Sequence, residues 1–140
     1  MARLGDMTCR EHLVGARVAH LATAGLDLQP HLVPVTYAVE GDEIVIGIDQ
    51  KPKTTYNLRR LRNIAENPRV AILCDHYDDD WTQLWWVRAD GSADIVTEGD
   101  AWSAAIEQLT AKYEQYQSDP PRGPVIRIHV DALSGWSYSS

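Results

Sequence analysis

Phenylalanine is absent from this 140-residue chain, whereas tryptophan occurs five times and tyrosine six times. The large aromatic rings therefore mostly carry a polar edge, which suits partly exposed positions. The two cysteines, Cys9 and Cys74, are too few for a disulfide framework and fit a reducing cytosol. No apolar run approaches the ~20 residues that span a bilayer, and no secretory signal is visible. We therefore expect a cytoplasmic protein with no membrane segment.

Length and composition are those of one globular domain. The chain is 44% hydrophobic and 24% charged, which is close to the globular average and argues against disorder and coiled coil. Its length suffices for one compact domain and is too short for two. Because no linker, repeat or low-complexity tract divides the sequence, we predict a single domain over residues 1–140.

Positive charge is concentrated in one segment. The net charge of −7 argues against a nucleic-acid binder. Residues 51–62 (KPKTTYNLRRLR) nevertheless hold five of the 13 basic side chains and no acid. An acidic protein that collects basic groups in this way usually presents them to an anion, so we expect an anion-binding segment here.

Alternation and turn residues divide the chain mainly into strands. Strands are expected over residues 17–23, 31–39, 43–48, 69–74, 81–89, 92–97 and 125–130. The first three should form an antiparallel meander, and Pro34 should lie at an edge or bulge. The pair Asp90-Gly91 is expected to turn the chain between two strands. Six or seven antiparallel strands indicate a mainly β fold, a small β-barrel with flanking helices.

Three helices accompany these strands in the prediction. Thr8 and Glu11 have the spacing of a capping box and predict a helix over residues 8–15. A second helix should begin near Pro52 and end before Asn67-Pro68. The third is expected over residues 98–116, with one apolar face made of Trp102, Ala105, Ile106, Leu109 and Tyr113.

The clearest binding feature is the connection from the third strand to the second helix. Free backbone N–H groups at a helix N-terminus bind phosphate, and Lys51, Lys53, Thr54 and Thr55 would add charge and hydroxyl donors. Arg59 and Arg60 lie close enough in sequence to reach the same anion. A solvated basic helix face is the alternative interpretation.

The aromatic run over residues 81–89 is the second feature. Alternation along a strand places Trp85 and Trp86 on opposite faces, so both cannot enter the same core. One should face the barrel while the other covers a planar ligand or a partner subunit, unless both are half-buried at the barrel rim. Trp136, near the C-terminus, is also expected to dock on the protein or a ligand.

Self-sufficient catalytic motifs are missing. The pairs Cys9/His12 and Cys74/His76 have metal-like local spacing but lack the second pair of a zinc site, so no metal is expected. No nucleophile elbow, phosphate-binding P-loop or dinucleotide fingerprint occurs. Because no nucleophile–base pair is recognisable, any catalysis should rely on a bound cofactor.

The order of these motifs resembles the split β-barrel superfamily, which includes pyridoxamine-5'-phosphate-oxidase-like flavoproteins and deazaflavin (F420)-dependent reductases. The resemblance rests on residues 31–35 (HLVPV), a Gly-Asp turn, a basic loop, residues 63–70 (NIAENPRV) and a Gly91 hairpin. Residues 51–53 (KPK) and 84–88 (LWWVR) are similar to an actinobacterial F420-dependent branch. The resemblance covers residues 10–138.

The resemblance implies a homodimer of split barrels with two cofactor sites at the subunit interface. The cofactor phosphate would lie against Lys51, Lys53, Thr54 and Thr55 or, in a second alignment register, against Arg59, Arg60 and Asn63. The cofactor ring would rest along Pro34, Val35 and Thr36. An aromatic side chain of the other subunit would close the site, the candidates being Trp85, Trp86 and Trp136.

The implied activity is hydride transfer from reduced F420 to an unsaturated or heteroaromatic small molecule. No catalytic residue is assigned, although His31 or Tyr37 could donate a proton. F420 is preferred over FMN because its poly-glutamate tail would use more cationic groups than one phosphate needs. The alternatives are an FMN-dependent oxidoreductase, a non-catalytic F420 carrier and a haem-binding barrel.

Overall fold

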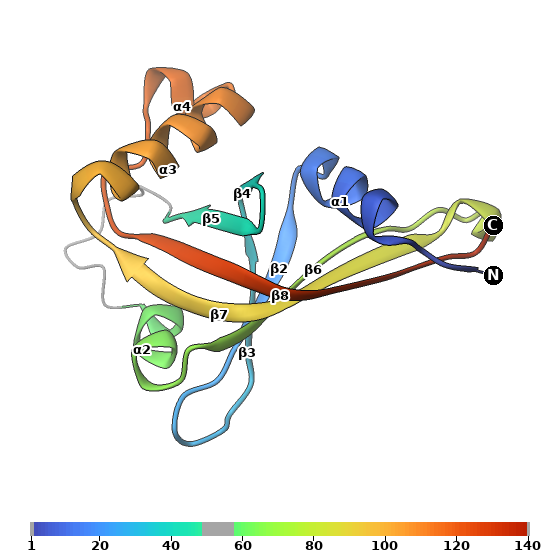
Figure 1. Cartoon of the computed structure of the whole chain (residues 1–140), viewed down its shortest axis with the longest axis horizontal. Coiled ribbons are helices and arrows are strands. Elements are labelled where there is room, and N and C mark those ends of the chain that lie inside the picture. Colours follow the sequence, from blue (N-terminus) through green and yellow to red (C-terminus); the bar gives the residue numbers. More distant parts are fainter. Residues whose placement is uncertain (1, 49–57, 140) are drawn as a thin grey trace.

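Figure 1 shows a computed structural model of the chain, which describes residues 2–48 and 58–139. The elements follow in the order β1 (Ala2–Arg3), α1 (Asp6–Gly15), β2 (Ala19–Thr23), β3 (His31–Val35), β4 (Tyr37–Glu40), β5 (Glu43–Gly47), α2 (Arg59–Glu66), β6 (Arg69–His76), β7 (Trp85–Val96), α3 (Gly99–Lys112), α4 (Gln115–Ser118) and β8 (Val125–Ser137). A 3-10 turn, Trp81–Gln83, precedes β7. The expectation of a mainly β fold is confirmed.

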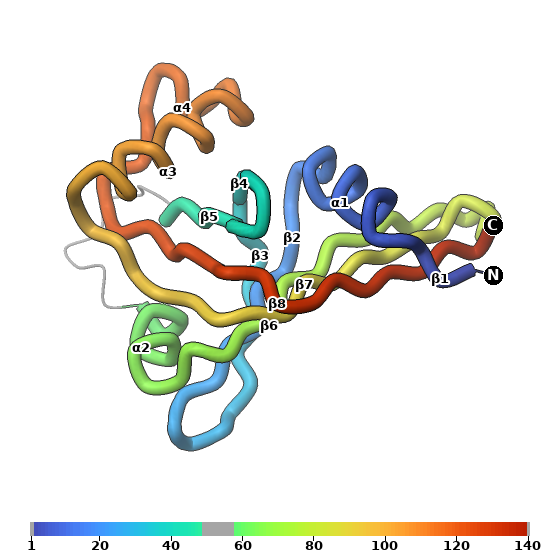
Figure 2. Tube along the Cα trace, viewed as in Figure 1, coloured from blue at the N-terminus to red at the C-terminus, as the bar shows by residue number. Residues whose placement is uncertain are grey.

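The strands form one antiparallel sheet that curls into a split barrel. Its order is β3-β2-β6-β7-β8-β5-β4, with the short β1 beside β8. The two ends of this order, β3 and β4, are separated in the chain by Thr36 alone. One continuous segment therefore supplies both ends of the sheet, and Figure 2 shows it crossing the long β7–β8 pair.

The prediction of a three-stranded meander is wrong at its middle strand. β2 pairs with β3 and β4 pairs with β5, but the expected strand over residues 31–39 divides at Thr36. Pro34 lies on β3, opposite His20, at the end of the strand order. Its missing N–H group is tolerated on such an edge strand, so the prediction of an edge position is confirmed.

The predicted turn at Asp90-Gly91 is also wrong, because β7 runs through it without interruption. The pairing of β7 with β8 shifts by one residue there, from Asp90 opposite Ala132 to Gly91 opposite Val130. A Cβ atom on Gly91 would collide with the backbone oxygen of His129. The glycine therefore serves the close approach of two backbones at a β-bulge.

The ends of helices and strands differ from the prediction in three further places. α1 begins at Asp6 after the cap residue Gly5, which makes no side-chain cap bond, so the expected capping box is absent. The described part of the second helix begins at Arg59, whereas its expected start at Pro52 lies outside the described residues. Trp81 belongs to the 3-10 turn and not to the following strand.

Two apolar clusters hold the molecule together. The main core fills the barrel between the sheet and α1, which contributes Cys9 and Leu13. A smaller cluster packs α3 against β4, β5 and the start of β8, and it contains the expected face made of Trp102, Ala105, Ile106, Leu109 and Tyr113. α3 ends at Lys112, however, and the short α4 follows it. No helix among the described residues is long and apolar enough to cross a membrane.

We expect Gly91→Ala to lower the free energy of unfolding by about 2 kcal/mol, because the new methyl group forces two strand backbones apart. Urea denaturation measures this change. Gly15→Ala is the matched control, since nothing lies within 4 Å of a Cβ atom there. Equal stability of the two variants would contradict the close approach at the bulge.

Candidate functional site

A cleft of about 540 Å³ opens beside the break between β3 and β4. Its lining comes from several elements and comprises Arg17, Val18, Pro34, Val35, Thr36, Gly47, Arg60, Tyr113, Gln115 and Tyr116. The cleft thus gathers the three residues expected beneath a cofactor ring and one of the basic candidates, Arg60. No acidic side chain belongs to this lining among the described residues.

The break at Thr36 is fastened to the helical segment by two tyrosines. The Thr36 Oγ1 and Tyr116 Oη atoms are 2.7 Å apart. The backbone N–H of Tyr37 donates to Tyr113 Oη over 3.1 Å. Because backbone polar groups inside a protein need partners, the end of α3 and the following α4 complete the barrel where the strand is interrupted. The same two tyrosines form one wall of the cleft.

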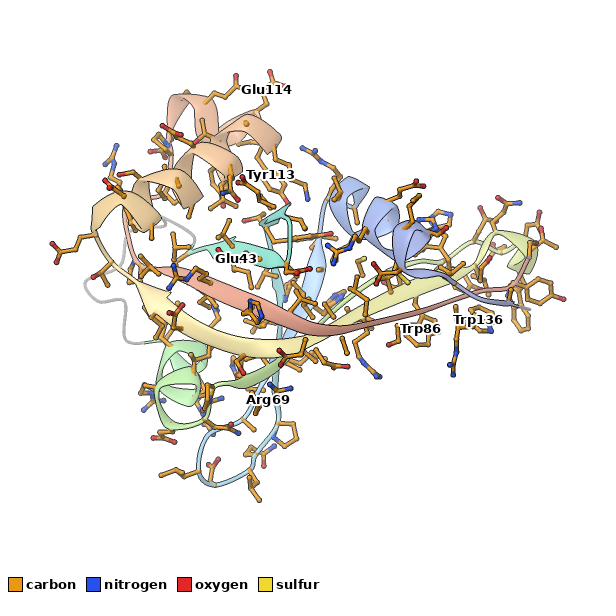
Figure 3. All side chains as sticks on the ribbon, in the orientation of Figure 1. Glu43, Arg69, Trp86, Tyr113, Glu114 and Trp136 are labelled. Atoms are coloured by element: carbon orange, nitrogen blue, oxygen red, sulfur yellow. The ribbon has the colours of Figure 1, made fainter. Side chains whose placement is uncertain are left out.

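Tyr113 is fixed on all sides. Its hydroxyl lies 2.9 Å from the backbone oxygen of Arg17 and 3.1 Å from that of Tyr37, so its single proton is committed. Its ring stacks edge to face on Tyr116, and the guanidinium carbon of Arg17 lies 4.8 Å from the ring centroid. Burial raises the pKa of the Tyr113 phenol, which stays neutral. Figure 3 shows Tyr113 directed toward the barrel, whereas its neighbour Glu114 points away.

Lys112 places a positive charge behind this wall. Its Nζ atom lies 3.9 Å from the Tyr37 ring centroid and 5.3 Å from that of Tyr113. The Nζ atom is buried without a hydrogen-bond partner among the described residues. Burial, together with the nearby Arg17, lowers the pKa of Lys112 from 10.5 to about 8. The amine therefore still carries a proton in most molecules at pH 7.

The basic side chains of α2 divide between two surfaces. Arg60 lines the cleft, whereas Arg59 donates to Asp27 and to Asn63 Oδ1, each over 3.2 Å. Asn63 is 2% exposed, and its Nδ2 atom donates to Thr23 Oγ1 over 3.0 Å. Arg59 and Asn63 thus hold α2 to the β2–β3 hairpin, and of this candidate set only Arg60 faces the cleft.

The other candidate set, Lys51, Lys53, Thr54 and Thr55, lies outside the described residues. The nearest described cleft residues on either side of it are Gly47 and Arg60.

The family model for pyridoxamine 5'-phosphate oxidase matches residues 6–137. The chain belongs to this family. Comparison with the curated proteins found no match.

Solved structures share the fold of this family member. A conserved hypothetical protein from Mycobacterium tuberculosis is 24% identical, with a TM-score of 0.78 over 96% of this chain and 86% of that one. An FAD-binding protein from Mesorhizobium loti is 20% identical, with a TM-score of 0.74 over 96% and 95%. HutZ, the haem storage protein of Vibrio cholerae, is 17% identical, with a TM-score of 0.72 over 91% and 92%. These likenesses establish the split-barrel fold.

The three candidate tryptophans lie away from the cleft in this family member. Trp85 and Trp86 face opposite sides of the sheet, as the alternation predicted. Trp85 stacks on His12 of α1, with ring centroids 4.0 Å apart, and packs against the core. Trp86 is the cross-strand partner of Trp136, and Figure 3 shows both on the side of the β7–β8 pair opposite to α1.

Trp86 borders a second hollow, on the outer face of the sheet. This hollow has a volume of about 440 Å³ and is lined by His20, Ala22, Leu32, Ala71, Leu73, Asp75, Trp86 and Arg88. Its apolar members come from β2, β3, β6 and β7, and Leu32 is 66% exposed. The outer face therefore presents a partly exposed apolar patch.

Neither expected proton donor reaches the cleft. Tyr37 is fully buried, and its hydroxyl donates to the backbone oxygen of Leu13 inside the barrel. His31 begins β3 and does not belong to the cleft lining. Tyr116 does line the cleft but was missed because the sequence pattern continued the preceding helix through it. The spacing of Tyr113 and Tyr116, three residues apart, was the available signal.

The described residues contain no cluster of three or more His, Cys, Asp or Glu side chains that could hold a metal ion. Cys9 and Cys74 are both buried and free. Burial raises the pKa of each thiol, that of Cys74 to about 11, so both remain protonated and unreactive at neutral pH.

Lys112 should make stability depend on pH. Its folded pKa of about 8 lies below the unfolded value of 10.5, so the unfolded chain binds more protons between these values. Stability contributed through Lys112 therefore rises as the pH increases through this window. We expect the free energy of unfolding of wild type, relative to Lys112→Met, to increase from pH 7 to pH 9.

Urea denaturation at both pH values measures this difference, and the comparison cancels groups common to the two proteins. Lys112→Arg, which stays charged throughout, should show no comparable increase relative to Lys112→Met. A wild-type difference that is constant with pH would contradict the buried amine.

Proposed function

We propose that this protein is an oxidoreductase that binds the deazaflavin F420 in the cleft beside Thr36. The observation that carries the proposal is the composition of that cleft. It combines an apolar strand, hydroxyl donors and two arginines in one cavity of about 540 Å³. When bound, reduced F420 supplies a hydride for an unsaturated or heteroaromatic small molecule.

The cleft residues fit a planar, anionic cofactor. Pro34 and Val35 offer an apolar surface for a flat ring, and the Thr36 hydroxyl supplies a directional hydrogen bond at its edge. Arg60 faces the cleft from α2 and suits a phosphate, because its planar guanidinium binds phosphate oxygens in pairs. The described lining has no acidic side chain, although the chain has a net charge of −7, and this favours an anion.

The chain's own part in the reaction is to orient the reactants and exclude water. The α3–α4 segment forms one wall, held in place by the bonds of Tyr113 and Tyr116 to the strand break. A wall tied to the barrel at two points keeps the reacting groups at a fixed separation. The Tyr116 hydroxyl, which lines the cleft, would form a hydrogen bond to the substrate.

FMN is the second candidate cofactor, and family membership favours it. The FAD-binding protein from Mesorhizobium loti shares this fold. F420 is preferred because residues 51–62 carry five basic groups, more than a single phosphate requires, and its poly-glutamate tail would use the rest. A non-catalytic F420 carrier would bind in the same way without turning over substrates.

We also propose that the protein is a homodimer whose interface includes the outer hollow. Leu32, Leu73 and Trp86 form an apolar surface there, beside the charged pair Asp75 and Arg88. A second copy that buries this patch removes exposed tryptophan and leucine surface from water. Trp86 or Trp136 of one copy would then stand at the partner's cofactor site, as the resemblance implied.

We expect purified protein to bind F420 saturably and more tightly than FMN in parallel fluorescence titrations. Arg60→Ala should weaken F420 binding by about 1–3 kcal/mol through the loss of charge-assisted bonds. Arg62→Ala is the matched control, because this exposed arginine of the same helix does not line the cleft. Binding of neither cofactor would refute the proposed function, and a preference for FMN would replace F420.

The double variant Lys51→Ala/Lys53→Ala, measured in the same titration, separates the two candidate phosphate sets. A loss larger than that of Arg60→Ala assigns the phosphate chiefly to the two lysines. Wild-type affinity of the double variant together with weakened Arg60→Ala assigns it to α2.

Trp86→Glu should convert the dimer to a monomer, because a carboxylate at the centre of an apolar interface is desolvated without a partner. Sedimentation velocity measures the change. Trp81→Glu is the control, since Trp81 is 60% exposed on the 3-10 turn and does not line the outer hollow. A wild-type monomer, or a dimer that survives Trp86→Glu, would exclude this interface.

A further inference from the structure

We propose that Arg17 binds a carboxylate of the substrate, so that this protein acts on planar carboxylic acids. The inference rests on the proposed function, because it places the substrate in the same cleft as the cofactor. It is carried by the position and fixation of Arg17, the lack of an acidic partner for it, and the apolar and hydroxyl groups beside it.

Arg17 is held at the edge of the cleft from two directions. It lies between α1 and β2, and its Nη2 atom donates to the backbone oxygen of Lys112 over 3.0 Å. Its guanidinium carbon lies 4.8 Å from the centroid of the Tyr113 ring. A guanidinium fixed by stacking and by one hydrogen bond loses little further freedom when it binds a ligand.

The other N–H groups of this guanidinium have no acceptor among the described residues. Six other arginines of the described chain do form ion pairs with aspartates, namely Arg10, Arg59, Arg69, Arg88, Arg122 and Arg127. Arg17 forms none, although the chain carries 20 acidic side chains. Two parallel N–H···O bonds to a carboxylate would use the remaining donors.

Lys112 strengthens the case for an anion at this place. Its buried Nζ atom lacks a hydrogen-bond partner in the described structure, and burial followed by the nearby Arg17 lowers the pKa of Lys112. The groups around it are the rings of Tyr37 and Tyr113, the thiol of Cys74 and Arg17 itself. None of these is an anion at neutral pH, so a bound carboxylate would offset the repulsion between the two cations.

The rest of the cleft wall fits a flat, mainly apolar body attached to that carboxylate. Val18 follows Arg17 directly, and the Tyr113 ring continues the apolar surface. The Tyr116 hydroxyl, held by Thr36, can bond a carbonyl or ring nitrogen of the substrate. Arg60 lines the cleft from α2 and is assigned to the cofactor phosphate, so the two arginines serve two different anionic groups.

The test is isothermal titration of cofactor-saturated protein with 2-naphthoate and with the uncharged 2-naphthamide. We expect Arg17→Gln to raise the Kd of naphthoate by about tenfold to a hundredfold and to leave that of naphthamide unchanged. Arg122→Gln is the control, because Arg122 is exposed on the turn after α4 and does not line the cleft. Thermal melting confirms that all variants are folded.

A second readout follows Lys112 directly by NMR of protein labelled at lysine Cε. The chain contains only three lysines, so Lys51→Arg and Lys53→Arg variants assign the Lys112 signal by elimination. Saturating naphthoate should raise the pKa of Lys112 in wild type and leave it unchanged in Arg17→Gln. This measurement needs no turnover and can also be made on cofactor-free protein.

Two results would overturn the inference while leaving the proposed function intact. One is naphthoate affinity that is the same in wild type and Arg17→Gln. The other is an Arg17→Gln variant that loses F420 affinity in proportion to the number of glutamates in the tail, which would assign Arg17 to the cofactor. Failure of the proposed function is a different result, namely a wild type that binds neither F420 nor FMN.

Discussion

The structure depends on how the chain satisfies its backbone at one interrupted strand. β3 and β4 lie at opposite ends of the sheet order and are separated by Thr36 alone. The Tyr113 hydroxyl pairs with the backbone N–H and carbonyl oxygen of Tyr37 at this point, and the Tyr116 hydroxyl bonds the Thr36 side chain. Side chains from the α3–α4 segment, and not a continuous ladder of strand hydrogen bonds, hold the chain at this break. The cleft lies beside them.

The charges around the cleft follow from the same arrangement. Arg17, Arg60 and Lys112 approach the strand break from three parts of the chain, and no described acidic side chain lines the cavity. Elsewhere on the described surface arginines are neutralised by aspartates, as in the pairs Arg127–Asp94 and Arg69–Asp131. Within the described residues, this cavity therefore differs from the surrounding surface in having cationic groups without an acidic neighbour in its lining.

Periodicity predicted most strands, the apolar face of α3 and the opposite orientation of Trp85 and Trp86, and the missing N–H group of proline predicted the edge position of Pro34. It failed where a residue's role depends on distant contacts. Gly91 has the local signature of a turn, yet it is required by the approach of the His129 backbone. Thr36 resembles any strand residue until Tyr116 meets it, 80 positions later. Arg59 and Arg60 are adjacent in sequence but point in different directions from α2. Arg59 forms an ion pair with Asp27, whereas Arg60 lines the cleft.

The most direct test of this account is a crystal structure of the protein with F420 or FMN bound. We expect density for the tricyclic ring along Pro34, Val35 and Thr36, with Tyr116 beside it and the phosphate on the side of Arg60. A ring bound elsewhere, such as against Trp86 in the outer hollow with the cleft at Thr36 left empty, would contradict it.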